Sequence, residues 1–164
     1  RYRFSTMVEE FKLTIDNELN YEREAQNLIA VGRNLREFPN IQVPQPVMDY
    51  TTPRVLTMEY ISGRKITSLT PLARLEVKGG DLCEELFRAY LKQVLVDGIF
   101  HADPHPGNVF LTDEGRIALL DLGMVGHTAP AMQENLGKLL LAISDGNSDA
   151  VADLVIRTSE KTEE

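Results

Sequence analysis

A short polar loop between a predicted long helix and a predicted β-hairpin most constrains what this chain can fold into. Residues 101–108 hold two histidines, one aspartate, one asparagine and two prolines. Prolines restrict the backbone, and a loop held by rigid flanking elements is where functional side chains tend to lie. Asp121 and Gly123 follow closely, with Asp121 thirteen residues after Asn108. Together these polar residues predict a functional site.

The spacing of the polar residues indicates phosphoryl transfer. Mg²⁺ takes oxygen ligands, and Asn108 and Asp121 would supply an amide carbonyl and a carboxylate. Asp103 precedes Asn108 by five residues, the same step that separates the catalytic aspartate from the metal-binding asparagine in the kinase loop H-R-D-x-x-x-x-N. We therefore expect Asp103 to orient the attacking hydroxyl, and we place His101 beside it as the second catalytic candidate.

A metal-dependent hydrolase is the alternative for the same loop. His101, Asp103 and His105 could bind Zn²⁺, because imidazole and carboxylate groups are good zinc ligands. The chain offers only one further histidine, His127, and its single cysteine, Cys83, gives no CxxC pair. A two-metal site would be short of ligands, so phosphoryl transfer is favoured.

Composition limits the remaining function classes. The chain has 164 residues and 43% apolar content, which is enough for one domain with a sizeable core. Its net charge of −8 argues against a general nucleic-acid-binding surface. The longest apolar run, residues 139–143, is much shorter than the ~20 residues of a membrane-spanning helix. We expect a soluble domain as given, with no nucleic-acid partner.

Periodicity and turn signals predict an α+β fold whose first part is a helix followed by a hairpin. Apolar residues recur at three- and four-residue steps from Val8 and predict one helix of about thirty residues that ends near Phe38. Two β-rich runs around Thr51-Thr52-Pro53 predict a hairpin, and its second run, residues 55–60, is an apolar strand. A nucleotide base could meet the backbone of Glu59 to Ile61 at the end of this strand.

The second part is predicted to be mainly helical, with one polar hairpin. Val109–Thr112 and residues 117–120 flank Asp113-Glu114-Gly115, which is a hairpin signal. The expected helices are a short one from Pro71 that Gly79-Gly80 breaks, a long one capped by Asp81 and closed after Val96 by Gly98, one from Pro130 to about Ser144, and one from Ser148 to about Arg157. The tail from Thr158 to Glu164 is polar and is expected to fray.

Acidic residues of the first helix form a further candidate. Glu18, Glu22 and Glu24 are mostly expected to be solvated helix charges. One of them, if it faces the site, could hold a lysine that contacts phosphates. The residues alone do not choose between these two interpretations.

Four strings of the chain together resemble the UbiB/ADCK family of atypical, protein-kinase-like proteins. They are residues 18–27, residues 55–63, the H-A-D-P-H-P-G-N string at residues 101–108, and residues 120–123. The resemblance runs over nearly the whole chain, and H-A-D-P-H-P-G-N is highly specific to that family. It implies a partial N-lobe over residues 1–61, with an αC-type helix, a hairpin and a hinge. It further implies a helical C-lobe over residues 62–164, with the catalytic loop and the metal-binding hairpin.

The resemblance also implies a role for each site residue. Glu24 would be the αC-type glutamate that pairs with the nucleotide-binding lysine. Glu18 and Asn20 match the family's Glu-x-Asp element, which is thought to reach into the active site, with asparagine here in place of the second acid. The remaining roles would be the catalytic-loop aspartate at Asp103, the metal ligands at Asn108 and Asp121, and the hinge at Glu59 to Ile61.

By this resemblance the protein would bind ATP and Mg²⁺ and act as an ATPase or unorthodox kinase in ubiquinone or other isoprenoid-lipid metabolism. A lipid or membrane-bound partner, and membrane association of the full-length protein, are implied in the same way. The family's nucleotide-binding lysine and alanine-rich loop precede the helix that carries Glu24, whereas this sequence has only residues 1–5 before that helix. We therefore expect a truncated fragment that is inactive alone. The alternatives are a non-catalytic pseudokinase or scaffold, and a small-molecule phosphotransferase of the aminoglycoside or choline kinase type.

Overall fold

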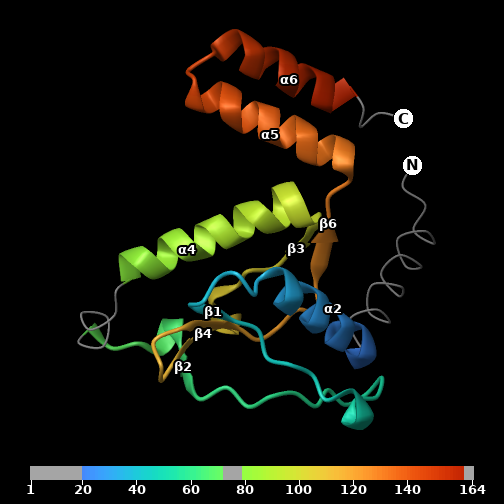
Figure 1. Cartoon of the computed structure of the whole chain (residues 1–164), viewed down its shortest axis with the longest axis vertical. Coiled ribbons are helices and arrows are strands. Elements are labelled where there is room, and N and C mark those ends of the chain that lie inside the picture. Colours follow the sequence, from blue (N-terminus) through green and yellow to red (C-terminus); the bar gives the residue numbers. More distant parts are fainter. Residues whose placement is uncertain (1–19, 72–78, 161–164) are drawn as a thin grey trace, which may run out of the picture.

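A first helix lies beside a small mixed sheet, and a layer of further helices lies beyond the sheet (Figure 1). The computed structural model describes residues 20–71 and 79–160. In this part of the chain the α-helices are α2 (Tyr21–Asn34), α4 (Gly79–Lys92), α5 (Pro130–Ser144) and α6 (Ser148–Glu160). The strands are β1 (Ile41–Gln42), β2 (Gly63–Lys65), β3 (Ile99–His101), β4 (Val109–Thr112), β5 (Ile117–Leu119) and β6 (Val125–His127). The α+β class predicted from the sequence is confirmed.

The strands form two sheets that hold the polar loop between them. The larger sheet has the order β1-β5-β4-β2, with β1 and β5 parallel and the other neighbours antiparallel. The smaller sheet pairs β3 with β6, so His101 lies opposite Val125. The family resemblance implies a boundary between two lobes at residue 61. The larger sheet contains strands from both sides of that residue.

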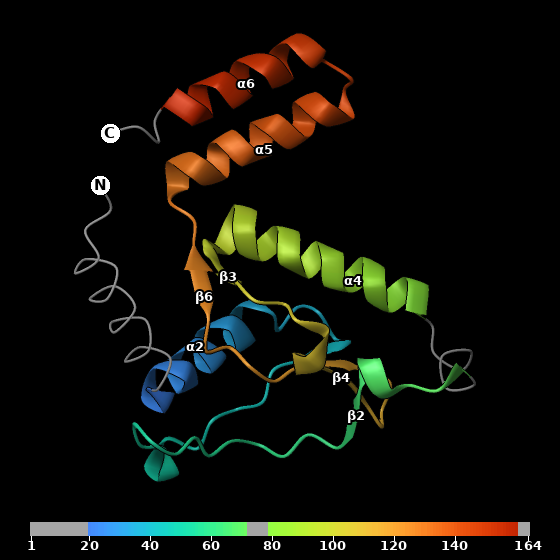
Figure 2. The same ribbon diagram turned by 180° about the vertical axis from the view of Figure 1, so that it is seen from behind.

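The apolar core lies where α2, α4 and the larger sheet meet. Leu28, Val31 and Leu35 form one buried stripe on α2 at helical spacing. They belong to the same buried cluster as Leu82 of α4 and Leu119 of β5. Figure 2, seen from behind, shows the same order as Figure 1, with α4 between the sheet and the paired helices α5 and α6. The core therefore fixes α2 against the hairpin that carries the polar site.

The start of α2 corrects the prediction of one continuous helix of about thirty residues. Asn20 has an extended backbone, with φ −106° and ψ 93°, and its side chain accepts a hydrogen bond from the Glu22 N–H. Asparagine is among the best N-cap residues, because its side-chain oxygen satisfies an N–H that has no partner inside the helix. Helix α2 thus begins at Tyr21, with Asn20 as its N-cap. The predicted cap at Thr6 and the acid Glu18 lie outside the described residues.

The chain reverses direction near Thr52 as predicted, but without a regular hairpin. Only isolated antiparallel bridges join the two arms, at Pro46 with Met58 and at Thr52 with Val55. Met48–Tyr50 forms a 3₁₀ turn rather than a strand. Proline has no backbone N–H to donate to a ladder, and the arms carry Pro44, Pro46 and Pro53. The predicted strand over residues 55–60 is therefore wrong.

Gly79 and Gly80 open α4, so the predicted cap Asp81 lies inside the first turn of the helix. An acidic residue in the first turn still interacts favourably with the helix dipole. The predicted short helix from Pro71 falls largely on residues 72–78, outside the described part. At the other end Gly98 closes the helix as predicted, with φ 69°, after a π-helical turn over Gln93–Asp97.

The predicted hairpin and last two helices are confirmed. β4 and β5 pair through the turn at Gly115, whose φ is 80°. α5 and α6 begin and end close to their predicted bounds. The prediction of a frayed tail from Thr158 is wrong for the first three residues of that tail, because α6 continues to Glu160. No helix within residues 20–71 and 79–160 has the length and apolar content needed to span a bilayer.

The backbones of β2 and β4 come close together at Gly63, and a substitution there tests this close approach. A Cβ atom at Gly63 would clash with the Leu111 carbonyl oxygen and lie 2.8 Å from Thr112 Cα, both of them backbone atoms. We expect Gly63→Ala to lower the free energy of unfolding by about 1–3 kcal/mol. Gly137→Ala in α5 is the control, because a Cβ there meets nothing within 4 Å. That variant should gain ~0.5–1 kcal/mol from helix propensity. Urea unfolding measures both, and equal stability of the two variants would contradict the close approach.

Candidate functional site

The polar loop after β3 is held in one shape by its own hydrogen bonds. The His105 N–H donates to the Asp103 carbonyl at 2.7 Å, and the Asn108 N–H donates to the His105 carbonyl at 2.9 Å. The His105 ring accepts from the Gly107 N–H at 3.0 Å, which caps the 3₁₀ turn Pro106–Asn108. The Asp103 side chain is exposed. The loop therefore presents the Asp103 carboxylate to solvent on a constrained backbone.

The β4–β5 hairpin brings the two predicted metal ligands together. Asn108 Nδ2 donates a hydrogen bond of 3.1 Å to Asp121 Oδ2. The backbone supports the pair, since the Leu120 N–H donates to the Asn108 carbonyl at 3.1 Å. The Gly123 N–H donates to Asp121 Oδ1 at 3.0 Å and orients the carboxylate. The contact that the sequence spacing predicts is present in the fold.

The chemistry of this donor pair fits Mg²⁺. Asn108 uses its amide nitrogen toward Asp121, so its amide oxygen remains a possible ligand. The Asp121 carboxylate is exposed and supplies the second hard oxygen. Mg²⁺ is commonly bound by one or two such protein groups together with substrate phosphates and water. Across residues 20–71 and 79–160 no group of three or more His, Cys, Asp or Glu side chains could hold a metal ion on its own.

Glu24 of α2 faces the same metal-ligand loop. Burial raises the pKa of its carboxyl, and the nearby charge of Asp121 raises it further, while the Leu122 backbone N–H acts in the opposite direction. Two carboxylates that repel each other across a short distance make a place where a cation is favoured. The αC-type helix and the predicted metal ligand are therefore brought together. The pairing of Glu24 with a lysine stays a prediction.

Asn27 is a contact residue that the sequence analysis missed. Its side chain is buried, and its Nδ2 donates a hydrogen bond of 2.8 Å to the Leu122 carbonyl. Asn27 lies three residues after Glu24, so both side chains project from one face of α2 toward the segment after Asp121. It is the last residue of the family-like string 18–27, which was the available signal.

A cavity of about 510 Å³ opens beside Glu24 and Asp121. Its wall comes from three segments that are distant in sequence: α2, residues 56–58, and the segment after β5. The lining side chains are those of Tyr21, Glu24, Leu56, Met58, Asp121 and Met124, with Gly123 at the same edge. This volume is within the range of small-molecule sites, and an apolar wall with a few polar groups is typical of them. The cavity therefore brings Glu24 and Asp121 to the wall of one hollow.

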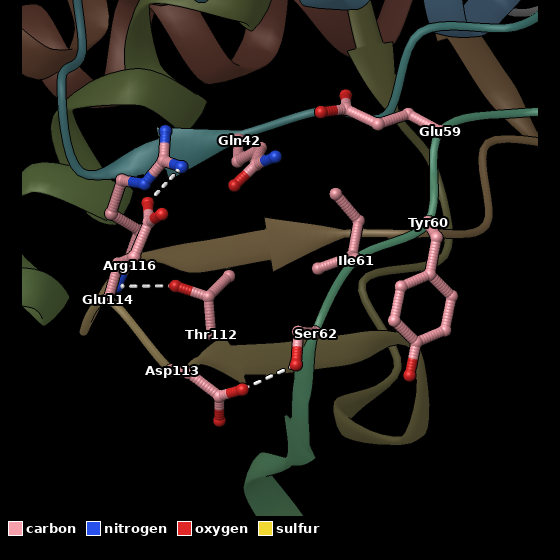
Figure 3. A pocket seen from close by; sticks show the side chains of 9 residues that line it. All are labelled: Gln42, Glu59, Tyr60, Ile61, Ser62, Thr112, Asp113, Glu114 and Arg116. Carbon is pink, nitrogen blue, oxygen red and sulfur yellow. Dashed lines mark hydrogen bonds and ion pairs between the residues drawn. The ribbon is translucent and has the colours of Figure 1, made fainter.

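The predicted hinge residues line a different cavity. Glu59 and Ile61 line a hollow of about 210 Å³. Figure 3 shows them together with Gln42 and residues of the β4–β5 turn. Within it, Ser62 hydrogen-bonds to Asp113, and Arg116 pairs with Glu114 at 2.5 Å (Figure 3). The Glu59 N–H donates to the Gln45 carbonyl at 2.9 Å, so that donor is already used. The structure therefore does not bring Glu59 and Ile61 into the same cavity as Glu24 and Asp121.

His101, the second catalytic candidate, is buried beneath the loop. Its exposed fraction is 3%, and its backbone N–H donates to Gln93 Oε1 at 3.1 Å. Burial lowers the pKa of its imidazole, against opposing effects from the Met124 backbone and from the charges of Asp121 and Asp103. His101 therefore supports the loop from inside the fold. Of the two catalytic candidates, Asp103 is the one that is exposed to solvent.

Comparison with known proteins places this geometry in a family. The model of the ABC1 atypical kinase-like domain matches residues 1–155. The chain belongs to the ABC1 atypical kinase-like family. The UbiB/ADCK resemblance of its motifs is thereby confirmed, since the similar proteins carry the ABC1 kinase names.

Two relatives and one solved structure illustrate the range of this ABC1 family. Protein ACTIVITY OF BC1 COMPLEX KINASE 8, chloroplastic, from Arabidopsis thaliana is 36% identical over 142 residues, which cover 85% of this chain and 19% of that protein. An uncharacterized protein of Synechocystis sp. is 36% identical, with 97% of this chain and 41% of that protein covered. The structure of Rv3197 from Mycobacterium tuberculosis in complex with erythromycin has a TM-score of 0.63 and 26% identity, with 90% of this chain and 37% of that chain covered.

These likenesses confirm the kinase-like α+β fold predicted for the chain. The chain spans less than half the length of the relatives that it matches. What those whole proteins bind or catalyse therefore enters below only as support for a proposal.

Proposed function

We propose that this ABC1 domain binds ATP with Mg²⁺ and that the full-length protein hydrolyses ATP or transfers its terminal phosphoryl group. The observation that carries the proposal is the hydrogen bond of 3.1 Å between Asn108 Nδ2 and Asp121 Oδ2. It joins the loop that presents Asp103 to the edge of the cavity that Glu24 and Asp121 line. Two oxygen ligands, an exposed carboxylate and a cavity are among the parts that phosphoryl transfer requires of a protein.

Each side chain has a distinct task in this proposal. Asn108 and Asp121 hold the metal ion through their oxygens, and Mg²⁺ when bound neutralises charge on the phosphate oxygens. The Asp103 carboxylate orients the attacking hydroxyl or water and accepts its proton. The apolar wall of the cavity, with Leu56 and Met58, packs against the nucleotide. Glu24 contributes negative charge that favours a cation near the phosphates.

The acceptor is a finer part of the proposal. A ubiquinone-type or other isoprenoid lipid, reached at a membrane, is supported by the family resemblance of the motifs alone. A hydroxylated small molecule is the second candidate. One observation favours it: the Mycobacterium tuberculosis relative was solved with erythromycin, which is a polyhydroxylated compound.

Nucleotide binding and turnover by the full-length protein test the proposal. Calorimetric titration with ATP should give tighter binding with Mg²⁺ than without it, and phosphate release should be measurable when both are present. The same assay with a hydroxylated acceptor or lipid vesicles, followed by product analysis, would distinguish hydrolysis from transfer. Equal ATP affinity with and without Mg²⁺ would contradict the metal site. Mg²⁺-dependent binding without any turnover would favour the pseudokinase or scaffold alternative.

A further inference from the structure

Buried polar atoms gather beneath the catalytic loop, and the proposed reaction does not use them. The Tyr90 hydroxyl and Gln93 Nε2 are buried without a hydrogen-bond partner among the described residues, and the ring nitrogens of His101 are buried near the Met124 backbone without a contact of full hydrogen-bond geometry. Gln93 is 0% exposed and His101 is 3% exposed. Buried polar groups in native proteins are nearly always hydrogen-bonded, either to protein or to ordered water. A group of such atoms in one place therefore points to a bound ligand.

Gln93 and His101 are in direct contact, and Tyr90 lies one helical turn before Gln93. Gln93 Oε1 accepts the His101 backbone N–H at 3.1 Å, so the Gln93 amide lies directly against the start of the loop. Tyr90 precedes Gln93 by three residues, which places both side chains on one face of the helix formed by α4 and its π-helical last turn. The site therefore lies between this helix face and His101.

The same site reaches the catalytic aspartate. Burial together with the charge of Asp103 raises the pKa of Tyr90 to about 12. Asp103 follows His101 by two residues, and the Ala102 N–H between them donates to the Met124 carbonyl at 3.0 Å. Whatever fixes Tyr90, Gln93 and His101 also fixes the loop that presents Asp103.

The donor set identifies the ligand class. The Gln93 amide nitrogen donates two hydrogen bonds, neutral imidazole has one donor and one acceptor, and a phenol both donates and accepts. A small neutral molecule that donates and accepts equally matches this mixture, and a buried water typically makes about three such bonds. A cation is disfavoured, because the Gln93 amide nitrogen can only donate.

We propose that Tyr90, Gln93 and His101 enclose bound water that fixes the catalytic loop against α4, and that Gln93 is the positioning residue of this network. The effect of Gln93 on turnover rests on the proposed function. The water site and the hydrogen bond between Gln93 and the His101 N–H do not depend on the proposed function. Gln93 contacts no substrate in this scheme and acts through the His101 backbone and the bound water.

Gln93→Met tests the network, because methionine has a similar length and no hydrogen-bonding amide. Gln133→Met is the matched control: its Nε2 is also buried without a partner among the described residues, but Gln133 lies on α5 and its amide is near Gly98, where the helix before β3 ends. In the full-length protein we expect Gln93→Met to speed amide hydrogen exchange at His101 by a factor at least about 10-fold larger than the factor by which it speeds exchange in the core. It should lower the ATP turnover rate at least about 10-fold while the ATP dissociation constant changes less than about 3-fold.

Tyr90→Phe is the milder second variant, since it removes only the hydroxyl. It should lower turnover several-fold without changing ATP affinity. A crystal structure of the wild-type protein that shows ordered solvent should place a water within hydrogen-bonding distance of Gln93 Nε2. Exchange at His101 that is as slow in Gln93→Met as in Gln133→Met would overturn the inference, as would direct pairing of these atoms with protein groups alone. A protein without turnover contradicts the proposed function, whereas the exchange and solvent results still decide the network.

Discussion

Asp103→Asn is expected to lower the ATP turnover rate of the full-length protein by about 10²–10⁴-fold, the usual contribution of a positioned general base. Asparagine keeps the size of the side chain and loses the charge that orients and accepts the proton of the attacking group. The Asp103 side chain is exposed, and the contact that shapes the loop uses its backbone carbonyl, which accepts from His105 at 2.7 Å. The loop geometry should therefore survive, and the ATP dissociation constant should change by less than about 3-fold.

Asp153→Asn is the matched control for this change. It removes the same charge from an exposed position on α6, far along the chain from the loop. Phosphate release under saturating ATP and Mg²⁺, with calorimetric binding measured in parallel, separates turnover from affinity. Turnover in Asp103→Asn equal to that in Asp153→Asn would show that Asp103 has no part in the chemistry. Loss of ATP binding together with turnover would show instead that the substitution damages the site as a whole.

The hairpin that joins Asn108 to Asp121 illustrates what local sequence can predict. Asp113-Glu114-Gly115 permits a tight turn, and Gly115 adopts the left-handed conformation that such turns need, with φ 80°. Once the turn is set, its type and length fix the register of β4 on β5. The contact between the two metal-ligand candidates is therefore encoded within fourteen residues, from Asn108 to Asp121.

The sequence predictions failed where two local signals favoured different structures. The apolar stripe across residues 8–29 favours one continuous helix, yet the Asn20 side chain caps a new helix at Tyr21. β-Propensity in residues 55–60 favours a strand, but the opposing arm carries prolines that cannot donate to a ladder. β1 pairs instead with β5, which lies about 75 residues later, and only the tertiary fold brings these two strands together.

Residues that support the site were harder to predict than residues that would touch a nucleotide. Asp103, Asn108 and Asp121 follow a spacing that the chemistry itself requires. Asn27 and Gln93 follow no such rule, because each acts through a backbone group on another element: the Leu122 carbonyl and the His101 N–H. The available signal was the family-like string 18–27 for Asn27, and for Gln93 it was a polar residue in line with the buried Leu82 and Ala89. The sequence alone does not say which backbone group such a residue will meet.

Asp121→Asn is expected to abolish most of the Mg²⁺-dependent part of ATP affinity, a loss of at least about 100-fold. Changes to residues that merely support metal ligands already cost about 10–100-fold in metal affinity, and Asp121 would touch the ion itself. The new amide would keep an oxygen for the Gly123 N–H, now 3.0 Å from Asp121 Oδ1. Its nitrogen would then face Asn108 Nδ2, and two donors replace a hydrogen bond of 3.1 Å. The pair would separate as well as lose its charge.

The ATP affinity of Asp121→Asn measured without Mg²⁺ should not fall in the same way. A carboxylate repels phosphate, so its removal should leave Mg²⁺-free ATP affinity unchanged or improved. Calorimetric titration of wild-type and variant protein, each with and without Mg²⁺, gives the four affinities needed. Asn108→Leu is the companion variant, because it removes the second oxygen ligand without changing the net charge; it should lose the Mg²⁺ effect but gain nothing in Mg²⁺-free binding. An equal loss in all conditions would mean that Asp121 supports the fold of the segment after β5 and does not bind the metal ion.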